Sequence, residues 1–246
     1  MSDWVYGFFM AWGMFLAIPC PKKIWRESAR RKMLACLPLV GCVVGGVWVL
    51  CACLVQWLPG PLAAALLAAA PWLMTGFLHL DGFMDVCDAV LSRRDLETRR
   101  RILKDSHCGA FAVICMVLLA MGQWSAFLSA RSLSLWGLAL IPVASRSCAA
   151  LAVLTLRPLD SSQYSAMQRG GGPVWFAAVC LALSAVLPLL LAGSFAPAMT
   201  AVGCALAAWY GYRQLDGMSG DVSGFALTVG ELWGVLTLAV WRSVWN

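Results

Sequence analysis

Three aspartates at a regular spacing stand out in the segment HLDGFMDVCD, residues 79–88. Asp81, Asp85 and Asp88 occupy positions i, i+4 and i+7, and at about 100° per residue a helix would place them within about 60° of one another. Carboxylates that converge in this way repel one another unless a cation lies between them. Oxygen-only ligand sets are typical of hard divalent cations such as Mg²⁺, above all where phosphate groups supply further ligands. The spacing therefore predicts a site for a metal ion and a phosphate; aspartates that only solvate a helix end are the alternative interpretation.

A basic segment, SRRDLETRRRILKDSHCGAF, follows at residues 92–111. Asp95 can cap a short helix that carries most of its cations. Guanidinium groups bind phosphate oxygens in bidentate fashion, so arginines beside an acidic cluster suit a polyanionic substrate. Membrane orientation and attraction to anionic lipid would also explain them. Lys104 and Asp105, followed by a polar Ser-His pair, exceed what orientation requires, and they indicate chemistry.

Polar residues also occur in or beside apolar stretches nearer the C-terminus. Arg146 is a cation in an otherwise apolar stretch, where charge is costly enough to indicate a function, although a long side chain can also snorkel to the interface. Asp221 lies among the glycines of LDGMSGDVSGF, where glycine permits a close backbone approach and a helix N-terminus favours anions. Glu231 follows inside the last apolar stretch. A polar contact between helices is its alternative interpretation.

The composition is that of a membrane protein. Hydrophobic residues make up 61% of the chain and charged residues 12%, with a mean hydropathy of +0.79, whereas the apolar share of a soluble domain is usually about one half. No basic n-region and no small-residue cleavage site precede the first charged cluster, so we expect no cleavable signal peptide. The eleven cysteines form no C-x-x-C pair. They indicate neither a disulfide framework nor a zinc site.

Seven stretches are long and apolar enough to cross a bilayer as helices, which takes about 20 residues each. They are residues 34–55, 61–78, 109–128, 133–154, 174–192, 196–212 and 222–240. Residues 4–19 form a shorter apolar stretch that would lie in the interface, re-enter or cross. No internal repeat or linker divides the chain. The predicted fold is therefore one domain, residues 1–246, built as an all-α polytopic membrane bundle of about seven transmembrane helices.

The basic residues predict an orientation for this bundle. Alternating the seven spans puts residues 20–33, 79–108, 155–173 and 213–221 on one face, which carries 15 of the 18 lysines and arginines. Basic residues near membrane ends are retained on the cytoplasmic side, so we expect this face to be cytoplasmic. Nearly all the acids lie on the same face, although acids have little influence on topology. Their position indicates chemistry at the cytoplasmic surface.

Taken together, the motifs resemble a known family. H-L-D-G-x-x-D-x-x-D at 79–88, K-D-S-x-x-G-x-F at 104–111, a lone arginine in the fourth span and G-x-S-G-D-x-x-G ahead of the last span are similar to the pattern of cobalamin 5′-phosphate synthase, also called adenosylcobinamide-GDP ribazoletransferase. The resemblance covers nearly the whole chain, including the opening FLAIPCPKKIW. The chain departs from the family pattern at Ala17, where an arginine is common, and at Asp216, where a glycine is more common.

The resemblance implies a magnesium-dependent phosphoryl transfer. In this family the ribose 3′-hydroxyl of α-ribazole, or of its 5′-phosphate, attacks the cobinamide-bound phosphoryl group of adenosylcobinamide-GDP, and GMP leaves. The product is adenosylcobalamin or its 5′-phosphate. Mg²⁺ and the diphosphate would be bound by Asp81, Asp85 and Asp88, while Asp105 or Asp221 would be a further ligand or the base. The expected catalytic residues are Asp81, Asp85, Asp88, Lys104 and Asp105, and the expected substrate-binding residues are His79, Ser106, Arg146, Gly220 and Asp221.

Two other function classes compete with this one. CDP-alcohol phosphotransferases also place aspartates at i, i+4 on the cytoplasmic side, but their D-G-x-x-A-R pattern is absent, since Asp81-Gly82 leads here to Phe83-Met84-Asp85. A transporter would distribute charge through the bilayer depth, whereas nearly all the acids lie on one surface. We expect the two substrates and the lipid bilayer as partners and no nucleic acid, with a homo-oligomer left open. The expected location is the inner membrane of a prokaryote.

Overall fold

The computed structural model describes residues 2–130, 132–159, 162 and 171–244, and side chains as far as residue 240. Within these residues the fold is helical, and the only β-type contact is an isolated bridge between Pro158 and Met218. Five helical segments are long and apolar enough to cross a membrane: Leu37–Trp57, Ala110–Ser129, Leu135–Thr155, Gly172–Ala192 and Gly220–Val240. The protein is an all-α, multi-pass membrane protein, as the sequence predicts.

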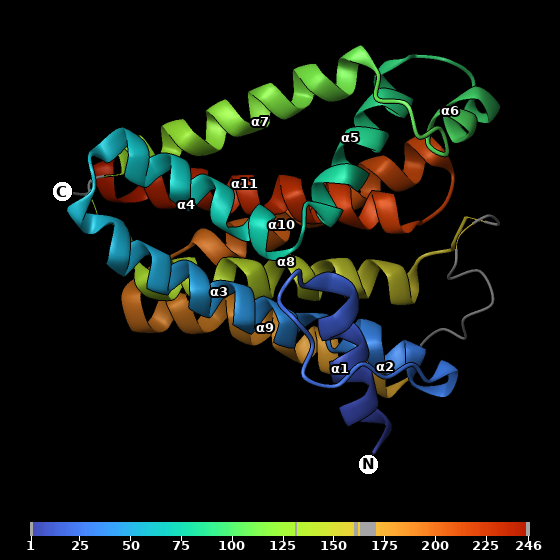
Figure 1. Cartoon of the computed structure of the whole chain (residues 1–246), viewed down its shortest axis with the longest axis horizontal. Helices are drawn as coiled ribbons and strands as arrows, with labels where there is room; N and C mark the ends of the chain where they lie inside the picture. Colours follow the sequence, from blue (N-terminus) through green and yellow to red (C-terminus); the bar gives the residue numbers. More distant parts are fainter. Residues whose placement is uncertain (1, 131, 160–161, 163–170, 245–246) are drawn as a thin grey trace.

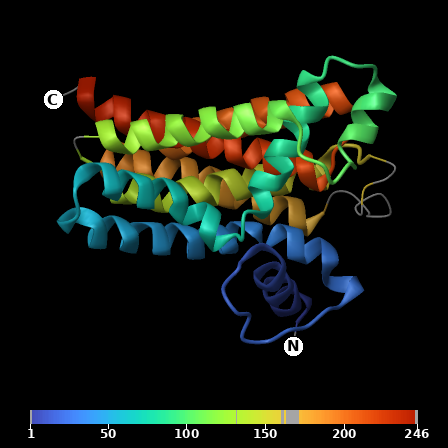
Figure 2. The ribbon, with the colours of Figure 1, turned by 45° about the horizontal axis from the view of Figure 1, so that its top comes forward.

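The long helices run side by side along one direction (Figures 1 and 2). They are α3 (Leu37–Leu54), α7 (Ala110–Ser129), α8 (Leu135–Thr155), α9 (Gly172–Ala192), α10 (Ala196–Leu215) and α11 (Gly220–Val244). The short helix α6 (Leu96–Ile102), helix α2 (Arg30–Ala35) and the α10–α11 turn lie at one end of the bundle, and the C-terminus lies at the other (Figure 1). The charged segments therefore share one end, as the alternation of spans predicts.

Helix α8 forms the centre of the bundle, and most of its side chains are buried. Small residues on its neighbour α3 allow the two backbones to touch. A Cβ added to Gly41 or Gly45 would collide with the backbone of α8 at Pro142 or Ala139. This G-x-x-x-G spacing places both glycines on one helix face, and small residues favour close helix packing in membranes because they increase van der Waals contact.

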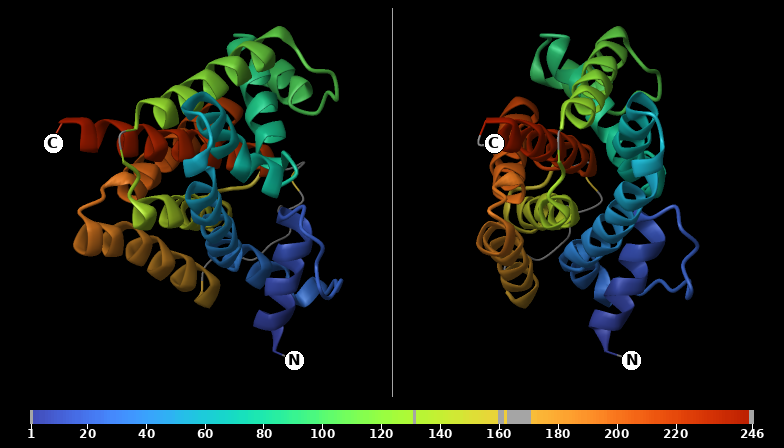
Figure 3. Two further views of the ribbon diagram at one scale, coloured as in Figure 1. Left: turned by 60° about the vertical axis from the view of Figure 1, so that its left-hand side comes forward. Right: turned by 90° about the vertical axis from the view of Figure 1, so that its left-hand side faces the viewer.

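The predicted span at residues 61–78 is not one straight helix. Helix α4 (Gly60–Met74) has only 15 residues, and α5 (Leu78–Leu91) leaves it at 93°. Gly76 and Phe77 adopt left-handed conformations at the break, with φ of +57° and +62°. Left-handed residues cannot continue a right-handed helix. Helix α5, which carries the three aspartates, consequently runs across the bundle instead of along it (Figures 1 and 3). Counted as one broken span, the pair raises the number of candidate spans from five to six.

The other predicted stretches also require adjustment. Residues 196–212 do form a helix, α10, but its last turns carry Trp209, Tyr210 and Arg213, so it is less apolar than the five candidate spans. The N-terminal stretch forms α1 (Asp3–Phe15), whose 13 residues are too few for about 30 Å of hydrocarbon. Figure 2 shows α1 nearly end-on while the bundle helices lie in the plane of the view. Helix α1 therefore crosses the bundle direction.

Candidate active site

Helices α5 and α11 cross with their backbones in contact because glycines lie at the crossing. A Cβ added to Gly82 would lie 2.8 Å from the Cα of Asp221, and one added to Gly224 would lie 3.0 Å from the carbonyl oxygen of His79. The Thr228 hydroxyl donates to that same carbonyl at 3.3 Å. A side chain on either glycine would push the helices apart. The glycines of the two motifs thus bring the first turn of α11 against the acidic helix.

Four carboxylates gather at this crossing. Asp85 experiences the negative charges of Asp81, Asp221 and Asp88, and Asp221 experiences that of Asp81. Asp81 is exposed, Asp85 and Asp221 are partly buried, and Asp88 is buried. In the part of the chain that the structure describes, no lysine or arginine forms an ion pair with any of them. The cluster therefore holds like charges close together without a counter-cation from these residues.

Asp88 differs from the other three acids because the protein itself uses its carboxylate. The backbone N–H groups of Gly109 and Ala112, at the start of α7, donate to its two oxygens at 2.5 and 3.0 Å. The first N–H groups of a helix have no partner within the helix and attract negative charge. A Cβ on Gly109 would lie 2.6 Å from both oxygens. Asp88 thus fastens α7 to α5, and glycine is required where the two meet.

This contact bears on the predicted metal site. Among the described residues, no three Asp, Glu, His or Cys side chains form a group that could hold an ion by themselves, and both oxygens of Asp88 already accept backbone hydrogen bonds. Binding of one metal ion by Asp81, Asp85 and Asp88 stays a prediction. The remaining donors are carboxylate oxygens of Asp81, Asp85 and Asp221. Mg²⁺ usually binds one or two carboxylates together with substrate phosphates and water, in place of an all-protein cage. These residues therefore fit a magnesium ion that binds together with a diphosphate.

A small pocket of about 170 Å³ lies beside Asp221. Its lining includes Lys104, Arg100, Ser219 and Gly220. The Ser219 hydroxyl donates to Asp221 at 3.3 Å and accepts from the backbone N–H of residue 222 at 3.2 Å, which caps α11. Helix N-termini bind anions through free N–H groups and the helix dipole. The pocket thus combines an ammonium group, a carboxylate and a helix start, all drawn from motifs that the sequence singled out.

Asp105 lies outside this pocket, on the exposed loop before α7. It accepts a hydrogen bond from the His107 backbone at 3.0 Å, and its carboxylate lies 2.6 Å from Nδ1 of the same residue. These contacts lower the pKa of Asp105 below its usual value and raise the pKa of His107. A carboxylate with a lowered pKa is a weaker base, so Asp221 is better placed to accept a proton. Ser106 is exposed beside them.

Arg146 lies inside the bundle, paired with Glu231. Its guanidinium group donates to Glu231 Oε1 at 2.7 Å and to the Pro142 carbonyl at 3.3 Å, and the Ser145 hydroxyl donates to the same carboxylate oxygen at 3.0 Å. Arg146 is 1% exposed and Glu231 4%. The alternative that Arg146 snorkels is therefore wrong, while the interhelical contact of Glu231 is confirmed. The role of Arg146 in substrate binding stays a prediction.

His79 occupies the first turn of α5. Its ring stacks on Phe15 of α1, with centroids 6.1 Å apart and planes at 16°. Its Nε2 atom is buried and has no hydrogen-bond partner within the described residues. The side chain thus joins the N-terminal segment to the acidic helix, and its role in substrate binding also stays a prediction.

The arginines of α6 have partners that the sequence did not reveal. Arg99 donates to Gln214 Oε1 at 2.6 Å, and Arg100 and Arg157 pair with Asp216 at 3.2 and 2.5 Å. The guanidinium groups of Arg157 and Arg100 hold the pKa of Asp216 below its usual range. Asp216 has a φ of +53°, a left-handed conformation that favours glycine. The two ion pairs stabilise an aspartate at this position, and together the contacts fix the turn that leads into Asp221.

The structure is thus that of a multi-pass membrane protein with a transverse acidic helix and a small charged pocket beside Asp221. The family described as cobalamin-5-phosphate synthase matches residues 7–239. The chain belongs to this family.

Individual relatives agree with this assignment. The chain is 35% identical over 249 residues to an adenosylcobinamide-GDP ribazoletransferase of Clostridium botulinum, an alignment that covers 96% of this chain and 98% of the relative. Proteins of the same name from Clostridium perfringens and Halalkalibacterium halodurans are 34% and 33% identical, covering 94% and 96% of this chain and 96% and 97% of the relatives. No solved structure matches the chain.

Proposed function

We propose that the protein is an adenosylcobinamide-GDP ribazoletransferase, which transfers adenosylcobinamide phosphate from adenosylcobinamide-GDP to α-ribazole or its 5′-phosphate and releases GMP. One structural observation carries the proposal: α5 and α11 cross so closely that Asp221 lies beside Asp81 and Asp85. Carboxylates gathered without a counter-cation suit a metal-bound diphosphate. The relatives that bear this activity in their name align over almost the whole chain.

Phosphoryl transfer depends mainly on positioning and on neutralising charge, and the site supplies both. Asp81 and Asp85 would hold Mg²⁺, which would neutralise charge on the diphosphate. Lys104 and the start of α11 bind phosphate oxygens. Asp221 accepts the proton of the ribose 3′-hydroxyl while the 3′ oxygen of the ribose forms the new bond to phosphorus. The bond to the departing phosphate breaks in the same displacement, and GMP leaves with the electron pair.

Two arrangements outside the pocket keep these groups in place. Asp88 holds the start of α7 against α5 through the N–H groups of Gly109 and Ala112. Arg100 and Arg157 fix the α10–α11 turn through Asp216. We assign both arrangements to positioning, because both oxygens of Asp88 and of Asp216 are held by these contacts and neither residue lines the Asp221 pocket. Their loss should disturb the site without removing a reacting group.

The end of the bundle that carries this site is proposed to face the cytoplasm, because 15 of the 18 basic residues fall in its four segments. Single cysteines at Glu97, in α6, and at Ser129, at the end of α7, report on opposite ends of the bundle in a cysteine-free background. In intact cells an impermeant thiol reagent should label Ser129→Cys and not Glu97→Cys. The reverse pattern would overturn the orientation.

The activity is tested by following GMP with time, first with adenosylcobinamide-GDP and Mg²⁺ alone and then after α-ribazole is added. In-line transfer predicts no GMP until the acceptor hydroxyl arrives. Steady release without acceptor would identify a hydrolase. A burst of one GMP per protein would instead indicate a covalent intermediate and overturn direct transfer.

A further inference from the structure

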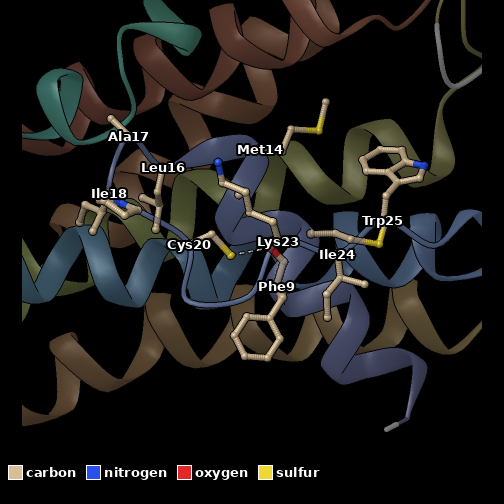
Figure 4. Close-up of a pocket in the computed structure, with 12 residues that line it drawn as sticks. Phe9, Met14, Leu16, Ala17, Ile18, Cys20, Lys23, Ile24 and Trp25 are labelled. Atoms are coloured by element: carbon tan, nitrogen blue, oxygen red, sulfur yellow. Dashed lines mark hydrogen bonds between the residues drawn. The ribbon is translucent and has the colours of Figure 1, made fainter.

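A second and larger pocket lies beneath the N-terminal segment. It encloses about 670 Å³ between the second half of α1 and residues 16–25 (Figure 4). Its walls are mostly apolar and include Phe9, Met14, Ile24 and Trp25, while Lys23 is the one cation among its lining residues. Figure 4 shows the Lys23 side chain extending between Leu16 and Met14. Small-molecule sites commonly enclose about 300–1,000 Å³ with apolar walls and few polar groups.

The pocket is held open by contacts within the N-terminal segment. The Trp12 indole N–H donates to the carbonyl of Ile18 at 3.2 Å, and the Cys20 thiol donates to the carbonyl of Phe9 at 3.5 Å. The Trp25 indole N–H donates to the carboxylate of Glu27 at 3.2 Å, and Glu27 begins the short η1 helix (Glu27–Ala29). A site whose walls are already in place loses little conformational entropy when a ligand binds.

The pocket adjoins the acidic helix. The Ala17 N–H donates to the carbonyl of Met74 at 2.8 Å, immediately before the break between α4 and α5. Phe15 stacks on His79, which precedes Asp81 by two residues on α5. A ligand in this pocket would therefore lie beside the first turn of the helix that carries the proposed diphosphate site.

We propose that this pocket binds the aromatic base of the ribazole acceptor, with Lys23 contacting the 5′-phosphate when the acceptor carries one. The assignment rests on the proposed function. A flat, largely apolar base suits aromatic and aliphatic walls. One ammonium group matches one phosphate, and within the described chain no carboxylate pairs with Lys23. The pocket suits a nucleoside better than the much bulkier corrinoid substrate.

Binding can be measured without turnover, because Cys20 lines the pocket. Purified protein in detergent is treated with a small water-soluble thiol reagent, and modification of each cysteine is quantified by mass spectrometry. At about ten times its Kd, α-ribazole 5′-phosphate should slow labelling of Cys20 about tenfold. The exposed Cys108, in the loop before α7, is the internal reference and should be unaffected. Protection of Cys20 by added phospholipid, but not by the acceptor, would make the pocket a lipid site and overturn the assignment.

The role of Lys23 is tested by comparing the two acceptors. Lys23→Met should raise KM for α-ribazole 5′-phosphate about tenfold, the scale of one lost hydrogen bond to a charged group. KM for unphosphorylated α-ribazole, KM for adenosylcobinamide-GDP and kcat should stay unchanged. Lys22→Met, at the neighbouring lysine that does not line the pocket, is the matched control. Equal effects on both acceptors, or no effect, would contradict the phosphate contact.

A second variant fills the pocket without unfolding the segment. A Cβ on Gly13 would meet only Cys20, at ordinary contact distances of 3.7 and 3.8 Å, and leucine is a good helix former. Gly13→Leu should therefore keep the melting temperature and raise KM for both acceptors about tenfold or more. Unchanged KM values with normal GMP formation would overturn the pocket assignment alone. Failure of the wild-type protein to form GMP would instead overturn the proposed function.

Discussion

Two groups of charged residues share helix α11 and differ in how their charge is balanced. Inside the bundle, Glu231 pairs with Arg146 at 2.7 Å, and both side chains are almost fully buried. At the start of the same helix, Asp221 lies beside Asp81 and Asp85, and none of these three acids has an ion-pair partner among the described residues. One region neutralises its charge internally, and the other does not.

The difference predicts a structural role for the buried pair and a binding role for the acidic crossing. A buried charge without a partner costs several kcal/mol, so the bundle can retain Arg146 only with Glu231 beside it. Carboxylates that repel one another at the α5–α11 crossing likewise weaken the fold. We therefore expect the carboxylates at the crossing to serve ligand binding and the Arg146–Glu231 contact to serve stability. Variants of the two regions should therefore differ in whether they lose activity or stability.

The largest expected effect is on catalysis at the acidic crossing. Asp81→Asn and Asp85→Asn should each reduce turnover at least about 100-fold, the scale of one important electrostatic contact in a transition state, while the protein still folds. Glu97→Gln removes an exposed acid of α6 and is the matched control, with near-normal activity expected. Turnover is measured as GMP formed at limiting Mg²⁺. Near-normal rates in both aspartate variants would leave the crossing with no catalytic role.

The next effect is on stability inside the bundle. Glu231→Gln leaves the Arg146 guanidinium buried with a weaker partner and should lower the unfolding free energy by about 3–5 kcal/mol. The double variant Arg146→Met with Glu231→Leu removes both charges and should recover much of that loss. Unfolding in detergent provides the measurement. A double variant as unstable as Glu231→Gln would show that the pair does not act by charge balance.

A smaller effect is expected from the spacing between α5 and α11. Gly82→Ala places a Cβ only 2.8 Å from the Cα of Asp221, so it should cost about 1–3 kcal/mol of stability and reduce activity as the carboxylates move apart. Gly46→Ala in α3 is the matched control, because nothing lies within 4 Å of a Cβ there. That variant should keep full activity and stability. Similar losses in both variants would indicate a general intolerance of alanine instead of a specific helix contact.

The smallest expected effect concerns pH at the loop before α7. Asp105 raises the pKa of His107, so the contact is present when the imidazole is protonated and is lost as the pH rises through that raised pKa. The chain has two histidines, His79 and His107, which makes NMR titration of labelled histidine practical. Asp105→Asn should move the His107 pKa back toward its usual value. An unchanged titration would show that the two side chains do not interact in solution.

Much of the fold could be predicted because a membrane-spanning helix requires a long run of apolar residues, which is visible in the sequence. The stretches at 109–128 and 133–154 agree with α7 and α8 within two residues. The break at Gly76 and Phe77 could not be predicted in this way, since the apolar run continues through it and only local left-handed backbone marks it. Helix α10 is not among the five candidate spans, because its last turns carry Trp, Tyr and Arg and make it less apolar.

The site was predicted in part. Motifs identified Asp81, Asp85, Lys104 and Asp221, and their glycines proved to be the points of close approach. The contact of Asp88 with α7 could not be predicted, because helical spacing alone does not show which carboxylate accepts hydrogen bonds from the first N–H groups of a later helix. The sequence does not reveal the pairing of Arg146 with Glu231 either, since the residues lie 85 positions apart and no local pattern links them.

The central claim is that the carboxylates at the α5–α11 crossing form an incomplete site that an added cation completes. Its most direct test is the melting temperature of detergent-purified wild-type protein and Asp85→Asn as Mg²⁺ is added in the presence of GDP, which supplies the diphosphate. Without Mg²⁺, Asp85→Asn should be at least as stable as wild type, because one repelling charge is gone. Mg²⁺ should then stabilise wild type, by about 2.7 kcal/mol at 100 times its Kd, and leave Asp85→Asn unchanged. A wild-type melting temperature that does not change when Mg²⁺ is added, with Asp85→Asn less stable than wild type, would contradict the account.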